Sequence, residues 1–512
     1  MSQNDEPEMR TPSQGDGREG THPISRRHLL QFGAAGLGAM ALAACSGPTV
    51  TSGSSGSGSA AGPGPGSSSS SSGSGSASGA GSGSGSASGS ASAGSGSASG
   101  SGSAASNPYK GVTPAKQIDF WSVHPGSSAA LEAQLVKAYN ASQSETTVKL
   151  VTAGQNYADV AQKFQTALAS NNVPALVMVS DVWWFTYVLN GNTVPIEPLA
   201  EAVGFDTSQY VKTFFDDYLY KDQHWAIPYA RSTPLFYYNK QHFQKAGLPD
   251  RAPKTWEEAD DFAKKLQSAD LGTQNVCNWA KPDNYIAWYY QNKAWGWGGA
   301  YSDQWDLSPM TGSGMLDSLA WSAKTMKKNG GWAGITSNSQ SNDLAAGTVS
   351  FCLESTGAMG NLLSNAKAPM GAGFLPGGPK ETDHVCPTGG TGIGISQKSG
   401  PEEQLAAMKF LQWLTNPENS LKFSETTGYL PVNTGADKQA LIKKTPLVQV
   451  PLDQLDHLHS QDWARVFITG GDLTIGTGIG EVLLKGTDPK TAMESVVKKL
   501  QQTYDRDIKP KL

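Results

Sequence analysis

The feature that most limits how this chain can fold is a tract of glycine, serine and alanine that fills residues 46–106. Such a composition offers too little apolar surface to offset the entropy lost on folding, so the tract is predicted to be a disordered linker. We take the linker to extend to residue 113 and the folded part to begin at Pro114. About 400 residues remain, which exceeds one ordinary hydrophobic core and predicts two lobes or domains.

The segment before the linker has the pattern of an export signal. Residues 25–31 read SRRHLLQ, and the apolar stretch that follows ends in LAAC at Cys45. Twin arginines before a short apolar stretch are typical of a Tat-type signal, and the small residues before Cys45 resemble a lipobox, in which the cysteine is lipidated. The alternative is an uncleaved transmembrane helix, but residues 29–44 fall short of the roughly 20 apolar residues that a span needs. We expect residues 1–45 to be a lipoprotein signal peptide that ends at Cys45. After cleavage the lipidated Cys45 becomes the mature N-terminus and anchors the protein to the outer face of the cytoplasmic membrane.

Composition argues against several classes of protein. The formal net charge of −5 at pH 7 argues against nucleic acid as a partner. With Cys45 assigned to lipid, the other cysteines allow one disulfide and one free thiol, and the sequence does not select the pair among Cys277, Cys352 and Cys386. No CxxC motif is present and the histidines are scattered, so we expect neither a metal site nor a cofactor.

Strand and helix patterns alternate from residue 117 onward. Residues 117–123 and 148–151 have the pattern of strands, and residues 175–179 form the continuous apolar run of a buried parallel strand. The apolar residues between 157 and 168 recur at helical spacing. This alternation predicts a doubly wound α/β sheet, which binds ligands at the carboxyl ends of its strands. The loops of interest are those at residues 122–128, 154–157 and 180–184.

A second lobe is predicted after residue 228. Residues 234–239 have the pattern of an aromatic strand, and Thr255 with Glu258 forms a capping box that opens a helix. Further along, residues 388–396 read as a glycine-rich strand and Pro401 begins another helix. The sequence therefore predicts two α/β lobes.

Three stretches resemble the bacterial ABC-importer solute-binding proteins of extracellular family 1, and among them the glycerol-3-phosphate binders. They are PLFYYNK at 234–240 with the AGL and PKTW that follow it, WLTNPE at 413–418 leading into TGYLPV, and FWS at 120–122. The resemblance implies the two-lobed periplasmic-binding-protein-like fold of type II, with a hinge and an interlobe ligand cleft. It also implies that the chain returns to the first lobe, with lobe 1 at 114–228 and 388–431 and lobe 2 at 229–387 and 432–512.

The function implied by this resemblance is transport without catalysis. The protein would be a monomer that captures a sugar, glycerol-3-phosphate or a glycerophosphodiester between its lobes and delivers it to the membrane subunits of the permease. A secreted hydrolase of glycans is the alternative, with Asp181 and Glu354 as a carboxylate pair.

The resemblance also assigns ligand contacts to individual residues. Asp181 would accept hydrogen bonds from ligand hydroxyls, Ser232 would bind the ligand directly, and a stacking aromatic ring lies near Trp279. The other positions that match the family's contacts are Tyr157, Ser355, Gly390 and Tyr429. Trp183 is added as a candidate stacking ring, because an indole needs a partner for its N–H when it is buried.

Some of these residues have a structural alternative. Tyr157 also belongs to an apolar helical stripe, and Asp181 is placed to cap a helix. The glycerol-3-phosphate binders carry an arginine near the C-terminus that pairs with the phosphate, yet residues 474–480 contain no basic residue. Arg231 would replace it from the hinge, or it would instead form an ion pair at the surface or between the lobes. Otherwise glycine-rich backbone cradles an anion, or the ligand lacks a phosphate monoester.

Overall fold

The computed structural model describes residues 107–123, 127–283, 285–383 and 386–512. The predicted signal peptide with Cys45 and most of the predicted linker lie outside these residues. The folded part begins before Pro114, because Tyr109 is buried and its hydroxyl donates to Gln404 Oε1 at 2.8 Å. Within the described ranges, no helix has both the length and the hydrophobicity of a membrane span.

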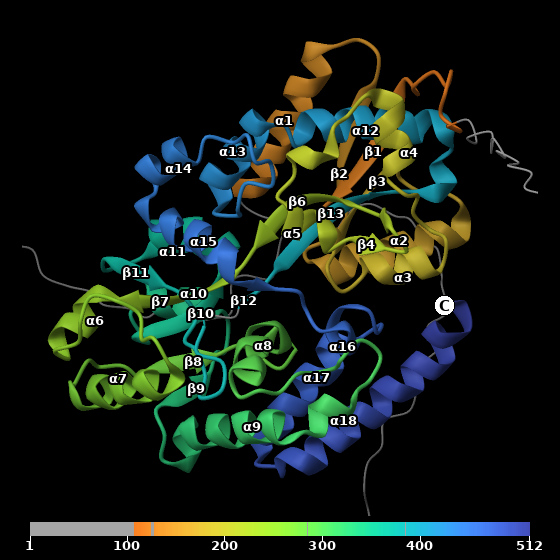
Figure 1. Cartoon of the computed structure of the whole chain (residues 1–512). Helices are drawn as coiled ribbons and strands as arrows, with labels where there is room; N and C mark the ends of the chain where they lie inside the picture. Colours follow the sequence, from red (N-terminus) through yellow and green to blue (C-terminus); the bar gives the residue numbers. More distant parts are fainter. Residues whose placement is uncertain (1–106, 124–126, 284, 384–385) are drawn as a thin grey trace, which may run out of the picture. The chain divides into compact units, whose positions relative to one another are not determined.

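The first lobe is built on a five-stranded sheet in the order β2-β1-β3-β13-β6 (Figure 1). Its strands are β1 (Gln117–Ser122), β2 (Thr147–Thr152), β3 (Leu176–Ser180), β6 (Ile227–Ser232) and β13 (Gly389–Ile395). β1 pairs in parallel with β2 and β3, whereas β13 runs antiparallel to β3 and β6. All residues of β3 are buried, as the continuous apolar run predicts.

Helices that precede, connect and follow these strands complete the first lobe. They are α1 (Ser127–Ser142), α2 (Tyr157–Ser170), α3 (Trp184–Leu189), α4 (Glu197–Val203), α5 (Lys212–Asp216), α12 (Pro401–Leu414) and α13 (Pro417–Thr427), with the small hairpin of β4 (Leu219–Tyr220) and β5 (Gln223–His224). The helix predicted to begin at Pro401 is α12. The aromatic side chains of Tyr139 and Phe410 join α1 to α12, with ring centroids 5.0 Å apart.

The second lobe has a sheet in the order β11-β7-β10-β8-β9. Its strands are β7 (Pro234–Asn239), β8 (Cys277–Trp279), β9 (Ala333–Ile335), β10 (Phe351–Ser355) and β11 (Met370–Gly373). The helices of this part are α6 (Lys240–Lys245), α7 (Trp256–Ser268), α8 (Ile286–Gly296), α9 (Ser313–Thr325), α10 (Gln340–Ala345), α11 (Met359–Asn365), α14 (Lys438–Lys444), α15 (Gln449–Gln454), α16 (Trp463–Val466), α17 (Gly471–Gly480) and α18 (Pro489–Thr503). The predicted cap of α7 is present, because Thr255 Oγ1 accepts a hydrogen bond from Glu258 N.

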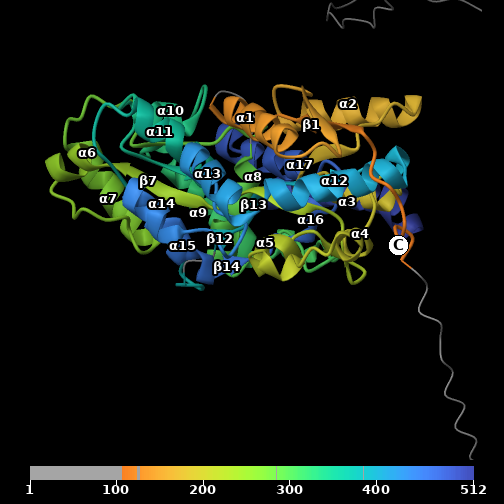
Figure 2. The ribbon, with the colours of Figure 1, turned by 90° about the horizontal axis from the view of Figure 1, so that it is seen from above.

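The chain passes between the two sheets through short segments. Thr233 alone separates the end of β6 from the start of β7. The chain returns through β12 (Cys386–Pro387), which pairs in parallel with β14 (Leu458–His459) and leads directly into β13. The chain thus returns to the first sheet through β13. Viewed from above, α2, α10 and α11 lie along one edge of the molecule, and α5, β12 and β14 lie toward the opposite edge (Figure 2).

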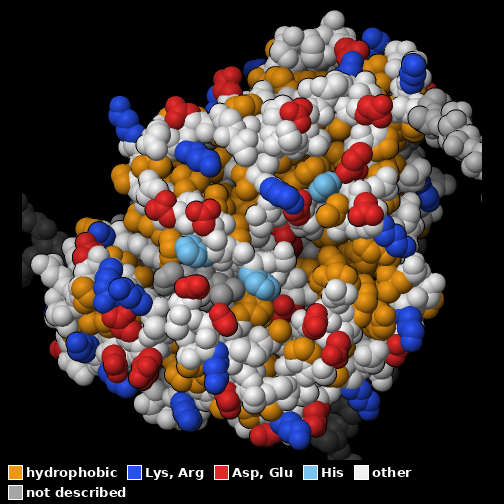
Figure 3. Space-filling model, viewed as in Figure 1, with side chains coloured by type: hydrophobic (Ala, Val, Ile, Leu, Met, Phe, Trp, Pro, Cys, Tyr) orange, Lys and Arg blue, Asp and Glu red, His pale blue; other side chains and the backbone are white. Residues whose placement is uncertain are grey.

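Both faces of the second sheet are buried. In β7, Phe236 and Tyr238 pack in the large hydrophobic cluster that also includes the core residues of the first lobe. Leu235 and Tyr237 point to the other face and pack in a smaller cluster. This alternation leaves little of the sheet exposed. The face of the molecule seen in Figure 3 shows acidic and basic side chains interspersed, in keeping with the small net charge.

The three cysteines in the described part of the chain are free and buried. Cys277 on β8 is in register with Phe351 on β10, so the next residue, Cys352, points to the other face of the sheet. Cys277 and Cys352 accordingly belong to different core clusters, and Cys386 lies on β12. The disulfide that the cysteine count allowed is therefore not formed.

Candidate ligand-binding site

A cavity of about 300 Å³ lies between the two sheets, lined from both lobes. Its walls contain six of the predicted site residues: Tyr157, Asp181, Ser232, Ser355, Gly390 and Tyr429. Its other principal side chains, which the sequence analysis did not assign to ligand binding, are Tyr285, Trp288, Tyr289, Gln340 and Arg465, together with Glu354 of the hydrolase alternative.

The first-lobe residues are placed by the ends of strands and the start of a helix. Tyr157 is the first residue of α2, whose N-terminus is capped by the Asn156 side chain through a hydrogen bond from Asp159 N. Asp181 directly follows β3, and Ser232 is the last residue of β6. These positions are the carboxyl ends at which α/β sheets bind ligands.

Two tyrosines meet across the cavity wall. The hydroxyls of Tyr157 and Tyr429 are 3.1 Å apart and share a hydrogen bond. Burial raises the pKa of both phenols, so both stay neutral and can donate. A Cβ added at Gly357 would lie 2.7 Å from the Tyr429 ring, so only glycine lets the loop after β10 approach this ring.

Gly390 occupies a position that no other residue fills without strain. Its φ is +110°, and an added Cβ would lie 2.0 Å from the carbonyl oxygen of Ala230. The Gly390 carbonyl accepts a hydrogen bond from Asp181 N at 3.2 Å. The backbone of β13 thus holds the Asp181 loop in place.

The aromatic floor comes from the start of α8. Trp288 Nε1 donates to the Thr388 carbonyl at 2.7 Å, and its ring packs against Gly389, where a Cβ would come within 2.4 Å. Tyr289 OH donates to Glu354 Oε1 at 2.6 Å. Burial raises the pKa of Glu354, which favours its neutral, protonated form.

Arg465 supplies the positive charge of the cavity. It follows Trp463 on the short helix α16 and is 1% exposed. Its Nε donates to Asp472 Oδ1 at 2.6 Å and its Nη1 to Asp181 Oδ2 at 3.1 Å, with a further bond from Nη1 to Gln461 Oε1. Its Nη2 donates to no residue that the structure describes. Among the described residues that line the cavity, Arg465 is the one arginine.

The remaining predicted residues lie elsewhere. Arg231 is fully buried, where its Nη1 donates to Tyr218 OH at 2.8 Å and its Nη2 pairs with Asp217. The ion pair with Asp217 is buried within the first lobe, so it is neither a surface pair nor a pair between the lobes, and Arg231 does not line the cavity. Trp183 precedes α3 at the margin of the core, and Trp279 packs edge-to-face in an aromatic cluster around Lys293.

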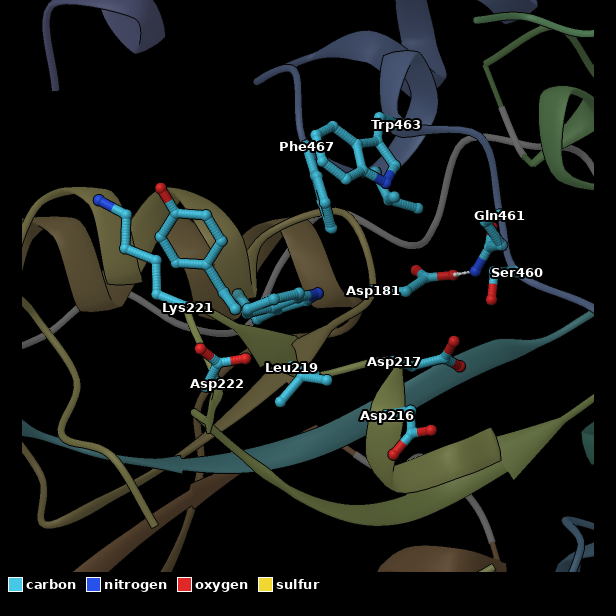
Figure 4. A pocket seen from close by; sticks show the side chains of 13 residues that line it. Asp181, Asp216, Asp217, Leu219, Lys221, Asp222, Ser460, Gln461, Trp463 and Phe467 are labelled. Carbon is cyan, nitrogen blue, oxygen red and sulfur yellow. Dashed lines mark hydrogen bonds between the residues drawn. The ribbon is translucent and has the colours of Figure 1, made fainter. Parts of the chain in front are cut away.

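A second hollow of about 420 Å³ adjoins the site (Figure 4). Trp463 on α16 and Phe467, which directly follows α16, lie on one side of this groove. They face Asp216, Asp217 and the β4–β5 hairpin on the other side. Asp181 lines both the groove and the cavity, and it accepts a hydrogen bond from Gln461 Nε2 at 2.7 Å. The Asp181–Gln461 pair therefore lies where the two spaces meet.

The described residues of the cavity and groove form no evident metal-binding site. In the ranges that the structure covers, no group of three or more histidine, cysteine or acidic side chains is arranged to hold an ion. The chemistry on offer is one guanidinium, carboxylates, hydroxyls and aromatic faces, which suits a polar ligand with an anionic group.

Residues 134–450 match the family model of the bacterial extracellular solute-binding proteins. The chain belongs to this family. It is 26% identical over 358 residues to the sn-glycerol-3-phosphate-binding periplasmic protein UgpB of Escherichia coli O6:K15:H31, covering 66% of this chain and 80% of that protein. The crystal structure of UgpB from Mycobacterium tuberculosis in complex with glycerophosphocholine is 39% identical, with a TM-score of 0.73 over 77% of this chain and 100% of that one. Maltose-bound MalE3 of T. maritima is 19% identical, with a TM-score of 0.66 over 76% of this chain and 100% of that one, and shares the fold.

Membership of the family confirms the resemblance drawn from the three sequence stretches, and the related structures confirm the two-lobed fold. The ligand contacts of individual residues stay predictions. Arg465 was missed because the arginine was sought at residues 474–480, nine residues further along. One signal was available: an arginine inside the apolar run WARVF is expected to be buried, and a buried arginine needs carboxylate partners or a ligand.

Proposed function

We propose that this protein captures a glycerophosphodiester between its two lobes and delivers it, unaltered, to the permease of an ABC importer. The observation that carries the proposal is the position of Arg465, a buried guanidinium whose Nη2 has no described partner, in an interlobe cavity with an aromatic floor. Charge-assisted hydrogen bonds from arginine to phosphate are among the strongest that proteins make.

The charge around Arg465 favours a diester over a monoester. Asp181 and Asp472 already lie within hydrogen-bonding distance of the guanidinium. A phosphodiester brings one negative charge, whereas a monoester near neutral pH brings between one and two and is repelled more strongly by these carboxylates. The complex of the related mycobacterial protein with glycerophosphocholine supports the same choice.

The aromatic and hydroxyl groups suit the glycerol part of such a ligand. Trp288, Tyr285 and Tyr289 offer apolar faces, and Ser232, Ser355 and Asp181 offer donors and acceptors for hydroxyls. The cavity of about 300 Å³ lies at the small end of the range for ligand pockets, which fits a compact ligand.

Calorimetric titration of the full chain tests the proposal. We expect glycerophosphocholine to bind with a dissociation constant in the range of about 1 µM, glycerol-3-phosphate to bind at least about tenfold more weakly, and maltose not to bind. The ligand recovered after overnight incubation should be intact by mass spectrometry. Binding of maltose alone would contradict the proposal, and release of choline would favour the hydrolase alternative with Asp181 and Glu354.

We also propose that the protein acts as a monomer exported by the Tat route and anchored through lipid on Cys45. The sequence at residues 25–45 supports this, as does the extracellular setting of the family. Changing Arg26 and Arg27 together to lysine should retain the precursor in the cytoplasm, and Cys45→Ala should release the exported protein from the membrane fraction. A membrane-bound Cys45→Ala protein would contradict the anchor.

A further inference from the structure

Behind the floor of the ligand cavity lies a chamber of about 20 Å³. Tyr289 and Gln340 line both spaces, so the wall between them is one side chain thick. Trp279, Tyr290 and Lys293 are among the other residues around the chamber. Lys293 lies about one turn along α8 from Trp288 and Tyr289 of the cavity floor.

The ammonium of Lys293 is enclosed by aromatic rings. Its Nζ lies 3.5 Å from the ring centroid of Trp279, 4.5 Å from that of Trp256 and 5.4 Å from that of Tyr290. The side chain is 3% exposed. Its Nζ forms neither an ion pair nor a hydrogen bond with any residue in the described ranges. Each ring stabilises a desolvated cation by about 2 kcal/mol, whereas burying an ammonium costs several kcal/mol.

A second donor at the chamber lacks an acceptor. Trp279 Nε1 is buried and makes no hydrogen bond to a described residue. Gln340, the amide on the opposite wall, directs its Nε2 to the Leu353 carbonyl at 3.0 Å. Two residues that line the chamber, Lys293 and Trp279, therefore each have a buried donor without a described acceptor, and an unmet buried donor is costly.

Among the described residues, no carboxylate forms an ion pair with Lys293. Trp256 on α7 and Trp321 on α9 are uncharged, and the titratable groups near the ammonium are Cys277 on β8 and Tyr289 and Tyr290 on α8. Burial raises the pKa of the Cys277 thiol and of both phenols, so all three are neutral at pH 7. Burial also lowers the pKa of Lys293 to about 7.

Glu354 and Asp343 are the nearby carboxyl groups, and both are engaged elsewhere. Glu354 accepts a hydrogen bond from Tyr289 OH on the ligand-cavity side. Asp343 on α10 accepts a hydrogen bond from Asn278 Nδ2 at 2.8 Å. Neither carboxylate pairs with Lys293.

We propose that the chamber is a binding site for a monatomic anion, chloride under cellular conditions, held by the Lys293 ammonium and the Trp279 indole N–H. One water needs about 10–15 Å³ of such space, so a chamber of about 20 Å³ has room for one particle somewhat larger than water, such as a chloride ion, and not for sulfate or phosphate. A bound anion would stabilise α8, and with it the aromatic floor of the ligand cavity.

Thermal unfolding of the full chain at pH 6 provides the first test. We expect sodium chloride or bromide, compared with sodium gluconate at equal ionic strength, to raise the melting temperature by about 2 °C, because an anion that binds the folded state stabilises it. The rise should shrink at pH 8.5, where Lys293 is neutral. Lys293→Met should abolish it, and the matched control Lys409→Met, which removes a surface pair with Glu145, should keep it.

Crystals of the wild-type protein soaked in bromide provide the second test, which does not depend on a variant that folds. An anomalous peak in the chamber beside Lys293 supports the proposal. A chamber without anomalous signal, no halide-specific shift in the wild type, or an unchanged shift in Lys293→Met would each overturn it.

Discussion

Replacing Arg465 with lysine separates ligand recognition from simple charge. The Arg465 guanidinium contacts Asp472 through Nε and Asp181 through Nη1, which leaves Nη2 for a ligand. Lysine keeps the positive charge but has only one nitrogen for all three contacts. A single ammonium cannot meet both carboxylates in the Arg465 geometry and also reach a phosphate. The variant should therefore bind the ligand more weakly and also unfold more easily.

The size of each effect follows from the hydrogen bonds lost. Loss of one charge-assisted hydrogen bond to the phosphate costs about 1.5–3 kcal/mol, which corresponds to roughly a tenfold to hundredfold weaker dissociation constant. Loss of one of the bonds to Asp472 or Asp181 costs a similar amount in the free energy of unfolding. Both carboxylates are largely buried, so solvent screening reduces these values little.

Arg231→Lys is the matched control. Arg231 is as buried as Arg465 and also pairs with an aspartate, Asp217, but it does not line the cavity. Calorimetry with glycerophosphocholine and urea unfolding should show that both variants lose stability and that only Arg465→Lys loses affinity. An affinity within twofold of wild type in Arg465→Lys, or an equal loss in Arg231→Lys, would refute the reasoning.

Four further changes probe the site and its supports. Asp181→Ala should weaken ligand affinity at least about tenfold, or 1.4 kcal/mol, measured by tryptophan fluorescence, and an unchanged affinity would remove Asp181 from the site. Tyr429→Phe breaks the 3.1 Å bond to Tyr157 OH and should lower the free energy of unfolding by about 1 kcal/mol in urea, with no change expected if that bond is absent in solution. Gly390→Ala should lower the melting temperature much more than Gly191→Ala. A Cβ at Gly390 would lie 2.0 Å from the Ala230 carbonyl oxygen, whereas a Cβ at Gly191 would face open space. Equal shifts in melting temperature would contradict this reasoning. Burial raises the pKa of Glu132 from 4.5 to about 7, so the folded state binds more protons than the unfolded state in this range. The free energy of unfolding should therefore fall by about 3 kcal/mol as the pH rises from 4.5 to 7. Glu132→Gln should remove this part of the pH dependence of urea unfolding, and an unaltered profile would count against the shift.

Much of the fold could be predicted because its signals are local. The apolar run that became β3 and the Thr255 cap of α7 each depend on residues within one element. Six of the predicted site residues came together in one cavity because they occupy positions that the family's sequence motifs mark.

The rest of the site depends on packing between distant segments. Arg465 and Arg231 are both buried arginines, and sequence alone does not say that one faces the cavity while the other pairs with Asp217 behind the sheet. Trp279 lies near the position at which the family resemblance places a stacking ring, yet its ring packs against Lys293 and does not line the ligand cavity. Which face a side chain presents is decided by partners far away along the chain, such as Trp256.

A crystal structure of the chain with glycerophosphocholine tests the central claim most directly. We expect a phosphate within hydrogen-bonding distance of Arg465 Nη2, with the glycerol against Trp288 and both lobes contacting the ligand. Ligand density confined to the groove beside Trp463 and Phe467, or a phosphate bound away from Arg465, would contradict it.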